Sequence, residues 1–571
     1  MDRVTKSFLN DFSKKFELEA ITDNTLRFEH FVNYAIVEPK IEYIFDIEDI
    51  NIGGNGTIGI DGFALLLNKQ LITTVDELTD FLDQYKKCSA EIIFIQSKTS
   101  TKFDSKDIGN FGFAVQDFIS ETQKLKWSDY GLEKIKLFNS FVDRISELKE
   151  KPICSLYYVT LGLNENDQNV LAKRQDILEN IKSENLFSKV TFELDGAIEI
   201  QEKYKTIGQT IEKAFEFPNR VTLPIIDNVK ESYIGVVDTT SIIELMTNSK
   251  GELLSHVFYD NVRDYQGDNK VNNEISNTIQ SSYKDSFSIL NNGITIVAEN
   301  LQTTRDTFTI TNYQIINGCQ TSHVLFENKE YLDASVQVPI KLVISDEEDL
   351  TSRIIRSTNR QTEVKEQDLL AFSNFQKRLE DYYRTFTGDD RLFYERRSKQ
   401  YNNGSVERKR IIDKTTQIKA MASMFYDKPN MATRFFGALF QEFGNKLFLD
   451  NHNMFPYYVA SFATYRVESL FRLKKIDKKY KKIKYHILTM LRHEINPISC
   501  SPFESKKSIF YCENIFDVIK DEDKSLKIIK NVIKRIDSLG YDLEDLQISK
   551  SKEFVTKCLH LYRSPDTHKN N

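Results

Sequence analysis

The sequence predicts a multidomain α/β protein, and the order of its apolar patterns is the main reason. Helical and strand-like segments alternate over residues 1–217, which is typical of a mixed sheet with flanking helices. Strands with short intervening helices predict an α+β domain over 218–390, and long amphipathic stretches predict a mainly α-helical C-terminal region over 391–571. A chain of 571 residues is long enough to form a core in each of these three domains.

Composition limits the kind of protein that this can be. The net charge is −7, so any nucleic-acid site must be a local basic patch on an acidic protein. The 6 cysteines show no metal-binding spacing, which is typical of reduced thiols inside a cell. The charged N-terminus is unlike a signal peptide, and no apolar run reaches the ~18 residues of a membrane span. We therefore expect a cytoplasmic protein without a membrane partner.

The elements expected in the N-terminal domain alternate along the chain. Helices are expected at 1–20, 26–38, 74–85, 105–123 and 130–149. Thr74 is a suitable N-cap for the third of these helices. Strands are expected at 41–50, 57–67, 91–98, 155–163 and 189–196, with a helix before the last one. Residues 92–95 are apolar on both faces, which is typical of a central strand covered on each side.

The elements expected further along the chain differ in kind. The segment 216–224 predicts a domain boundary. Strand-like segments then dominate as far as about residue 345, with short helices between them. From about 346 to the end the pattern is mainly helical, with charged amphipathic stretches.

The stretch EIIFIQSKTS, residues 91–100, ends an apolar strand in two polar side chains. Because a strand alternates its faces at every residue, Gln96 and Lys98 point the same way. Two further polar residues could meet them: Asp61 in the glycine-flanked segment GIDGF, and Glu29 on a helix. A lysine that is partly desolvated needs an anion nearby. That anion is either a structural carboxylate or a substrate phosphate.

These residue types meet the chemical requirements of phosphodiester hydrolysis. A divalent cation held by oxygen ligands polarises the phosphoryl oxygen and lowers the pKa of an attacking water, and Mg²⁺ typically takes one or two carboxylates. Asp61 and Glu29 would supply the carboxylates, Gln96 a neutral carbonyl, and Lys98 a charge that stabilises the transition state. The spacing also allows a purely structural interpretation, in which Lys98 pairs with Glu29 or Asp61 and Gln96 caps a backbone group.

The motifs FEHFV, GIDGF and IFIQSK, in this order on helix, strand and strand, resemble the Mrr-type branch of the PD-(D/E)xK nucleases over roughly residues 20–165. The resemblance implies a restriction-endonuclease-like fold and a Mg²⁺- or Mn²⁺-dependent endonuclease. It implies the catalytic residues Asp61, Gln96, Lys98 and Glu29, with Asp61, Glu29 and Gln96 as metal ligands. Gln96 replaces the acidic residue of the motif, as is usual in this branch, and no proline precedes Asp61. Glu91, at the other end of the strand, is a fallback acid.

Polar clusters at element ends stand out in the middle domain. They comprise Asn291, Asn292, Asn317, Gly318, Gln320 and Thr321, which we expect to form a ligand-binding turn, and Arg356, Asn359 and Arg360, which we expect to contact nucleic acid. Backbone N–H groups in a first helical turn favour anions, and amides and arginines suit phosphate, sugar or base contacts. The same groups are equally suited to holding loops together.

The order of these clusters carries a second resemblance. The motifs NVRDYQG, NNGITI, INGCQTS, STNRQTEV and FYERRSKQY resemble the AIPR family, named for abortive infection and phage resistance. With the nuclease-like front end, the match covers about residues 20–440. It implies a role in bacterial antiphage defence with a nuclease as the effector. A weaker resemblance to ParB- and DGQHR-type domains implies a module that reads nucleotide or DNA.

Two basic segments are candidates for nucleic-acid contact. The segment YERRSKQYNNGSVERKR, residues 394–410, interleaves two tyrosines with Arg396, Arg397, Lys399, Arg408 and Arg410. It is also interpretable as a solvated loop that pairs with nearby acids. The lysine-rich segment 472–486 would wrap a helix in positive charge, which indicates either phosphate contacts or a solvated face.

The hypothesis that joins these observations is a metal-dependent nuclease of antiphage defence that hydrolyses nucleic acid, with DNA as the expected substrate. A homo-oligomer or partner subunits of a defence system are compatible with it. The alternative is a catalytically inert protein that binds nucleic acid or senses phage within a defence complex. The substitution Lys98→Ala separates the two, because it should abolish cleavage and leave binding nearly intact.

Overall fold

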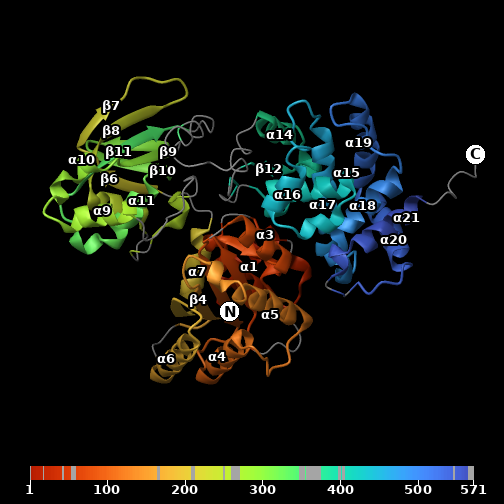
Figure 1. Ribbon diagram of the computed structural model, residues 1–571, viewed down its shortest axis with the longest axis horizontal. Helices are drawn as coiled ribbons and strands as arrows, with labels where there is room; N and C mark the ends of the chain where they lie inside the picture. Colours follow the sequence, from red (N-terminus) through yellow and green to blue (C-terminus); the bar gives the residue numbers. More distant parts are fainter. Residues whose placement is uncertain are drawn as a thin grey trace, which may run out of the picture. The chain divides into compact units, whose positions relative to one another are not determined.

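The computed structural model describes residues 2–16, 18–41, 44–52, 59–85, 87–163, 167–207, 212–247, 251, 253–258, 270–345, 354, 374–396, 400–401, 406–543, 545 and 547–563. The chain divides into two compact units (Figure 1). One comprises Met1–Ile207 together with Ser373–Asn571, and the other comprises Gly208–Phe372. The mixed α/β character expected from the sequence is confirmed, while the division into three domains stays a prediction.

The first unit contains a five-stranded sheet in the order β2-β1-β3-β4-β5. Its strands are β1 (Gly62–Leu67), β2 (Gln70–Ile72), β3 (Ala90–Lys98), β4 (Ile153–Thr160) and β5 (Lys189–Asp195). Strand β1 is antiparallel to β2 and β3, whereas β3, β4 and β5 are parallel. The predicted strand at 91–98 is therefore confirmed as the central strand.

One expected strand of this unit is wrong. In place of the predicted strand at 41–50, the described part has a 3₁₀ turn, η3 (Ile47–Asp49). The carboxylate of Asp46 caps this turn by accepting a hydrogen bond from the Glu48 N–H at 3.1 Å. A local side-chain cap of this kind competes with strand pairing.

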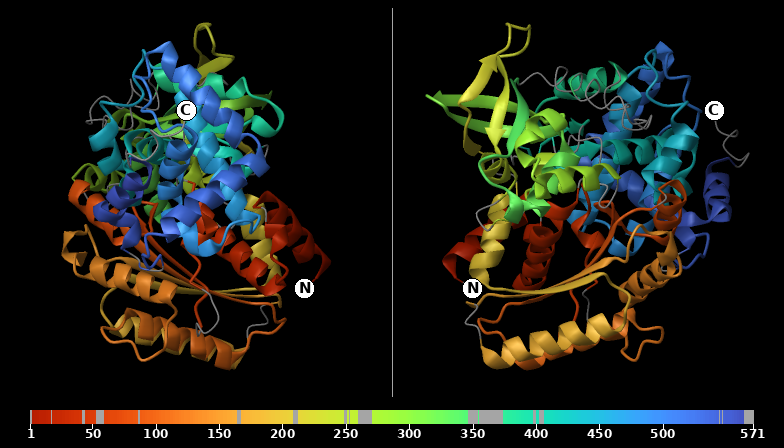
Figure 2. Two further views of the ribbon diagram at one scale, coloured as in Figure 1. Left: turned by 90° about the vertical axis from the view of Figure 1, so that its right-hand side faces the viewer. Right: turned by 60° about the vertical axis from the view of Figure 1, so that its left-hand side comes forward.

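Helices cover both faces of the sheet (Figure 2). The α-helices of this part are α1 (Arg3–Lys15), α2 (Asn24–Val37), α3 (Val75–Gln84), α4 (Ser105–Ile119), α5 (Asp129–Val142), α6 (Gln168–Ser183) and α7 (Ala197–Thr206). Helices α1, α2 and α7 share a core with Ile93 and Ile95, and α4, α5 and α6 share another with Ile92 and Phe94. Strand β3 is thus covered on both faces, as its continuous apolar run predicts.

The C-terminal part of the first unit is mainly helical, as predicted. Its elements are α14 (Asn374–Arg384), β12 (Phe393–Glu395), η9 (Arg408–Arg410), β13 (Ile411–Asp413), α15 (Lys414–Tyr426), α16 (Phe436–Phe443), α17 (Phe455–Arg472), η11 (Lys478–Ile483), α18 (Lys484–Ile495), α19 (Lys506–Ile519), α20 (Glu522–Asp537) and α21 (Lys552–Arg563). Most residues of α17 are buried, so this helix forms the centre of the bundle. The lysine-rich segment is not one helix, since η11 separates α17 from α18.

The second unit contains a six-stranded sheet in the order β6-β10-β9-β11-β8-β7. The strands are β6 (Glu212–Glu216), β7 (Asn219–Thr222), β8 (Glu231–Asp238), β9 (Ile294–Thr304), β10 (Thr307–Asn317) and β11 (Gln337–Ile344). Its α-helices are α8 (Thr239–Met246), α9 (Lys270–Gln280), α10 (Phe287–Leu290) and α11 (Cys319–Glu327). Helices α8, α9 and α11 share one apolar core with the sheet, which gives the α+β arrangement expected for this region.

Two further expectations can be compared with the structure. All six cysteines are free thiols, and all but Cys500 are buried. No helix in the described part of the chain combines the length and the apolar character that a bilayer crossing requires.

Candidate active site

The topology of the first sheet brings Asp61 beside Gln96. Gly62 at the start of β1 lies opposite Ile95 near the end of β3, so the residue before Gly62 faces the residue after Ile95. The Asp61 N–H donates to the carbonyl oxygen of Ile95 at 2.8 Å. Two polar residues that are 35 positions apart in the chain therefore meet where one strand begins and its neighbour ends.

The hydrogen bonds that described residues donate to the Asp61 carboxylate all end on one oxygen, Oδ2. Oδ2 accepts from Gln96 Nε2 at 2.7 Å, from the Ser97 N–H at 2.7 Å and from Ser97 Oγ at 3.1 Å. No donor among the described residues reaches Oδ1. The carboxylate is thus fixed in orientation by one oxygen while the other keeps its lone pairs free for a ligand.

The side chain of Gln96 is buried and only half satisfied. Its Nε2 donates to Asp61 and, at 3.2 Å, to the carbonyl oxygen of Ser97. Its Oε1 is buried and accepts no hydrogen bond from the part of the chain that the structure describes. A buried carbonyl without a partner costs about 1–3 kcal/mol, and native structures rarely retain one without a reason. A bound cation would satisfy this oxygen.

Glu29 extends from the first half of α2 and is half-buried. Its carboxylate forms no hydrogen bond or ion pair with any described residue. Burial, followed by the charges of Asp61 and Asp23, raises the pKa of Glu29 to about 8, and Lys98 acts in the opposite direction. Burial also raises the pKa of Asp61, against the hydrogen bonds from Ser97 and the charge of Lys98. Two neighbouring carboxylates with raised pKa values are typical of a functional site.

Lys98 ends β3 and is half-buried. It is close enough to lower the pKa of both Glu29 and Asp61. It nevertheless forms no ion pair with a described carboxylate. The ammonium group therefore adds positive charge to the site without being held by either acid.

The free oxygen atoms of this cluster are of the type that a hard divalent cation prefers. Asp61 Oδ1, Gln96 Oε1 and the Glu29 carboxylate are oxygen atoms without partners among the described residues. Mg²⁺ prefers oxygen ligands, usually with one or two carboxylates, and keeps several waters. Within the described residues no group of three or more His, Cys, Asp or Glu side chains could hold a metal. A site of two carboxylates and one amide is a different kind of donor set.

Two residues near this site were missed by the sequence analysis. Ser97 supplies two of the three hydrogen bonds to Asp61. Asn33 is buried on α2, one turn after Glu29, and neither polar atom of its amide has a partner within the described ranges. A Cβ on Gly62 would lie 2.3 Å from Asn33 Oδ1, so a larger residue beside Asp61 would displace the Asn33 amide. The four-residue spacing of Glu29 and Asn33 on one helix was the available signal.

The fallback acid Glu91 lies at the other end of β3. Its carboxylate pairs with Lys40 at 2.7 Å and accepts from Ser155 Oγ at 2.7 Å. It is therefore occupied by structural contacts.

In the second unit the structure brings the two polar turns together. Gly318 precedes α11 in the left-handed conformation, with φ 92°, and a Cβ there would lie 2.8 Å from the carbonyl oxygen of Gly293. Asn291 Oδ1 accepts from the Gly293 N–H at 2.8 Å and from Thr321 Oγ1 at 3.2 Å. Gln320 Oε1 accepts from Asn272 at 2.9 Å, Asn317 ends β10, and Asn292 is exposed. The hydrogen bonds given above are made within the unit itself.

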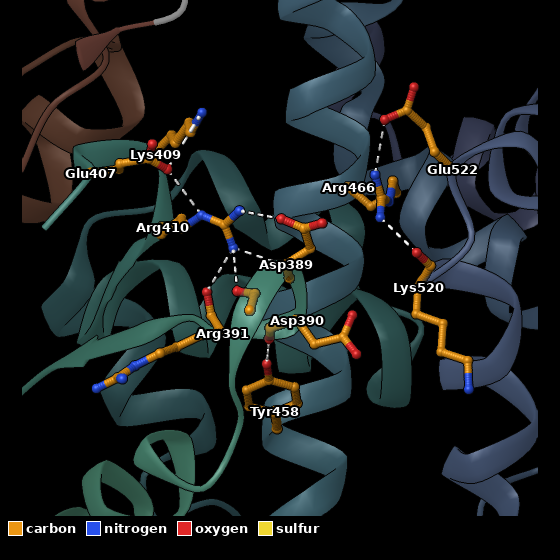
Figure 3. A network of polar contacts seen from close by, with 11 residues as sticks. Asp389, Asp390, Arg391, Glu407, Lys409, Arg410, Tyr458, Arg466, Lys520 and Glu522 are labelled. Carbon is orange, nitrogen blue, oxygen red and sulfur yellow. Dashed lines mark hydrogen bonds and ion pairs between the residues drawn. The ribbon is translucent and has the colours of Figure 1, made fainter. Parts of the chain in front are cut away.

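The predicted nucleic-acid residues that the structure describes are engaged with protein groups. Arg396 is buried and pairs with Glu380 at 3.0 Å. Arg410 donates to Glu407 at 3.0 Å and to the carbonyl oxygens of Asp389 and Arg391 at 2.8 and 3.0 Å (Figure 3). Arg408 pairs with Glu38 at 3.1 Å. Arg397, Lys399, Arg356, Asn359 and Arg360 lie outside the described residues.

Comparison with known proteins gives one match. A family model described as AIPR protein matches residues 258–545, which is half of the chain. No curated protein and no solved structure matches the chain. The matched segment begins after β3, so the cluster around Asp61 and Gln96 lies outside it.

Proposed function

The chain belongs to the AIPR family, which links it to abortive infection, and from this premise we propose that it is a metal-dependent nuclease of antiphage defence. The proposed active site consists of Asp61, Gln96, Lys98 and Glu29. The observation that carries the proposal is the set of oxygen atoms without partners at the end of β3, above all the buried Oε1 of Gln96.

The order of the elements supports a restriction-endonuclease-like fold for residues 1–207. A helix with an acidic residue is followed by an antiparallel strand, the central strand β3, a helix, and the parallel strands β4 and β5. In this arrangement Asp61 begins one strand and Gln96 ends its neighbour. The topology thus brings together the residues that the motifs GIDGF and IFIQSK indicated.

Each residue would have a separate role. Asp61 Oδ1, Gln96 Oε1 and Glu29 would hold a Mg²⁺ or Mn²⁺ ion, which when bound polarises the phosphodiester and lowers the pKa of a water molecule. Ser97 and the Gln96 amide keep Asp61 in one orientation through its Oδ2. Lys98 would place its ammonium group beside the negative charge that develops on the phosphate oxygens.

Nucleic-acid hydrolysis can be tested directly on the full chain. Purified wild-type protein and the variants Asp61→Asn, Lys98→Met and Glu91→Gln would be incubated with plasmid DNA, phage DNA and RNA, in Mg²⁺, Mn²⁺ or EDTA. We expect wild type to cleave in the presence of metal, and Asp61→Asn and Lys98→Met to lose about 10²–10³-fold in rate or more. Glu91→Gln is the matched control, because this acid lies on the same strand but at its other end.

The outcomes separate the alternatives. Cleavage of DNA but not RNA would identify DNA as the substrate, and cleavage of RNA but not DNA would identify RNA. Binding of nucleic acid without cleavage under every condition would favour the catalytically inert alternative. Equal cleavage by wild type and both site variants would overturn the proposed site.

A further inference from the structure

The turn η9 carries two arginines that contact different parts of the first unit. Arg410 contacts Glu407, Asp389 and Arg391, which all belong to the C-terminal part (Figure 3). Arg408, two residues earlier, contacts helix α2 of the N-terminal part. Both were predicted to contact nucleic acid, yet only Arg408 connects the helical region to the part that contains the candidate active site.

Arg408 is held as a buried, bidentate ion pair. Its Nη1 and Nη2 donate to the two carboxylate oxygens of Glu38 at 3.3 and 3.1 Å, and Nη1 also donates to Tyr34 Oη at 3.3 Å. The side chains of Arg408 and Glu38 are only 13% and 2% exposed. The guanidinium also lies over the rings of Phe16, Tyr34 and Phe45, at 5.8, 5.3 and 5.6 Å from their centroids. Bidentate geometry and surrounding aromatic rings make this a strong and specific contact.

This ion pair belongs to an interface in which one side supplies the acids and the other side supplies the bases. In every ion pair that the structure describes between residues 1–207 and 373–571, the acid comes from the N-terminal part and the base from the C-terminal part. These pairs are Glu38–Arg408, Asp46–Lys481, Glu48–Lys481, Glu48–Lys478, Asp76–Lys550, Glu77–Lys419, Asp80–Arg434 and Glu133–Lys482. The helical region is therefore electrostatically complementary to this face of the α/β part.

Helix α2 connects this interface with the candidate active site. Glu29 lies in its first half, Tyr34 in its second half, and Glu38 is the residue that caps its C-terminal end. The nine residue steps from Glu29 to Glu38 span about 13.5 Å of helix. Because the Glu29 carboxylate has no partner among the described residues, the position of this group depends on where the helix itself is held.

We propose that Arg408 is a positioning residue for the active site: through Glu38 and Tyr34 it fixes helix α2, and thereby the Glu29 carboxylate, against the end of β3. The inference rests on the proposed function and deepens it. It makes metal binding by residues 1–207 dependent on the helical region 373–571, so a change in that region would alter the active site without touching it.

The test compares Arg408→Gln with Arg434→Gln in the full chain. Arg434 is the matched control, because it also pairs an arginine of the helical region with a buried acid, Asp80, which lies on α3 and not on α2. Mn²⁺ binding by calorimetry and amide hydrogen exchange over 24–37 would be measured for both. Arg408→Gln should weaken Mn²⁺ binding about tenfold or more and speed exchange in α2, whereas Arg434→Gln should change neither.

A double variant tests whether the effect acts through Glu29. In a Glu29→Gln background, Arg408→Gln should produce no further loss of Mn²⁺ affinity, because the ligand that it positions is already absent. If Arg408→Gln does not fold, Glu38→Gln, which keeps the shape of the carboxylate, replaces it with the same expectations.

The outcomes separate the positioning role of Arg408 from the proposed nuclease function. Wild-type Mn²⁺ affinity and wild-type exchange in Arg408→Gln would overturn the inference and leave the proposed function intact. Equal effects of Arg408→Gln and Arg434→Gln would also overturn it, because the interface would then act as a whole. Failure of wild type to bind Mn²⁺ would overturn the proposed function, and the inference with it.

Discussion

The end of β3 and the basic segments of the C-terminal part differ in whether their charged groups form ion pairs. At the end of β3, Gln96 Oε1 and the Glu29 carboxylate have no partner among the described residues. In the C-terminal part, Arg408, Lys481 and Lys482 each face a carboxylate of the N-terminal part. Both regions were candidate functional sites in the sequence, the first because polar residues end an apolar strand and the second because basic residues cluster there.

The difference teaches which polar groups point to function. A matched ion pair is explained by the fold that it holds together, whereas a buried group without a partner lowers stability and needs another explanation. Raised pKa values at Glu29 and Asp61 agree with this distinction, because carboxylates with perturbed pKa values cluster at functional sites.

The largest effect is expected from the same substitution at two buried glutamines. Gln96→Leu removes the unsatisfied Oε1 and one of the bonds that orient Asp61, so we expect the cleavage rate to fall about 10²-fold with little loss of stability. Gln417 is bonded at both atoms of its amide: Oε1 accepts from Tyr383 and Ser461, and Nε2 donates to the Tyr457 carbonyl oxygen. Gln417→Leu should lower the free energy of unfolding by about 2–4 kcal/mol and leave cleavage by the folded protein near wild type.

Urea denaturation and rate measurements on both variants would check this. The comparison breaks if Gln96→Leu loses as much stability as Gln417→Leu, since Gln96 would then be a structural residue. It breaks equally if Gln96→Leu cleaves at the wild-type rate.

The next effect concerns how the free energy of unfolding depends on pH. We expect opposite signs for Glu29, near the end of β3, and for Asp46, at the basic interface. The pKa of Glu29 in the folded protein is raised, by burial and by Asp61 and Asp23, from about 4.5 to about 8. The folded state therefore binds more protons, and the stability due to Glu29 is present below pH 4.5 and lost as pH rises towards 8, by up to about 1.4 kcal/mol per pH unit. Burial acts to raise the pKa of Asp46, but the charges of Lys481 and Lys484 outweigh the effect of burial, so the pKa is lowered. Its contribution is present above about pH 3.8 and is lost as the pH falls below this.

Unfolding in urea at pH 5, 6, 7 and 8, with EDTA present, would measure the first contribution. Glu29→Gln should flatten the decline in stability between pH 5 and 8, and added Mg²⁺ should reverse it in wild type. An unchanged slope in Glu29→Gln would show that this carboxylate is not the group that titrates.

Much of the fold could be predicted from local patterns. Continuous apolar residues predicted β3 as a central strand, and Thr74 caps α3 as expected by accepting from the Glu77 N–H at 3.2 Å. The spacing of Gln96 and Lys98 placed both at the end of that strand. These features depend on neighbours within a few residues, which periodicity and capping rules describe well.

The features that were missed depend on contacts between distant residues. The acid that pairs with Arg408 lies 370 positions away, and the acid that pairs with Lys481 lies 435 positions away, so neither basic segment could be recognised as an interface. The strand predicted at 41–50 was wrong because Asp46 caps a turn there and faces Lys481. Asn33 was missed because its closeness to Gly62 appears only when α2 packs on β1.

The smallest effect is expected from two lysines of the basic interface, one with the most exposed side chain and the other with the longest ion pair. Lys478 pairs with Glu48 at 3.3 Å and its side chain is 64% exposed, and Lys482 lies 3.9 Å from Glu133. Replacing both with alanine should change the free energy of unfolding by less than about 1 kcal/mol, because exposed ion pairs contribute little. If the two lysines bound phosphates, their loss would also reduce the slope of log affinity against log salt concentration by about 2. We expect this slope to stay unchanged and the nucleic-acid affinity to stay within about twofold of wild type, because the two lysines face carboxylates of the chain itself. A filter-binding titration at several salt concentrations would measure the affinity and its salt dependence. A reduced slope would show that this segment contacts nucleic acid.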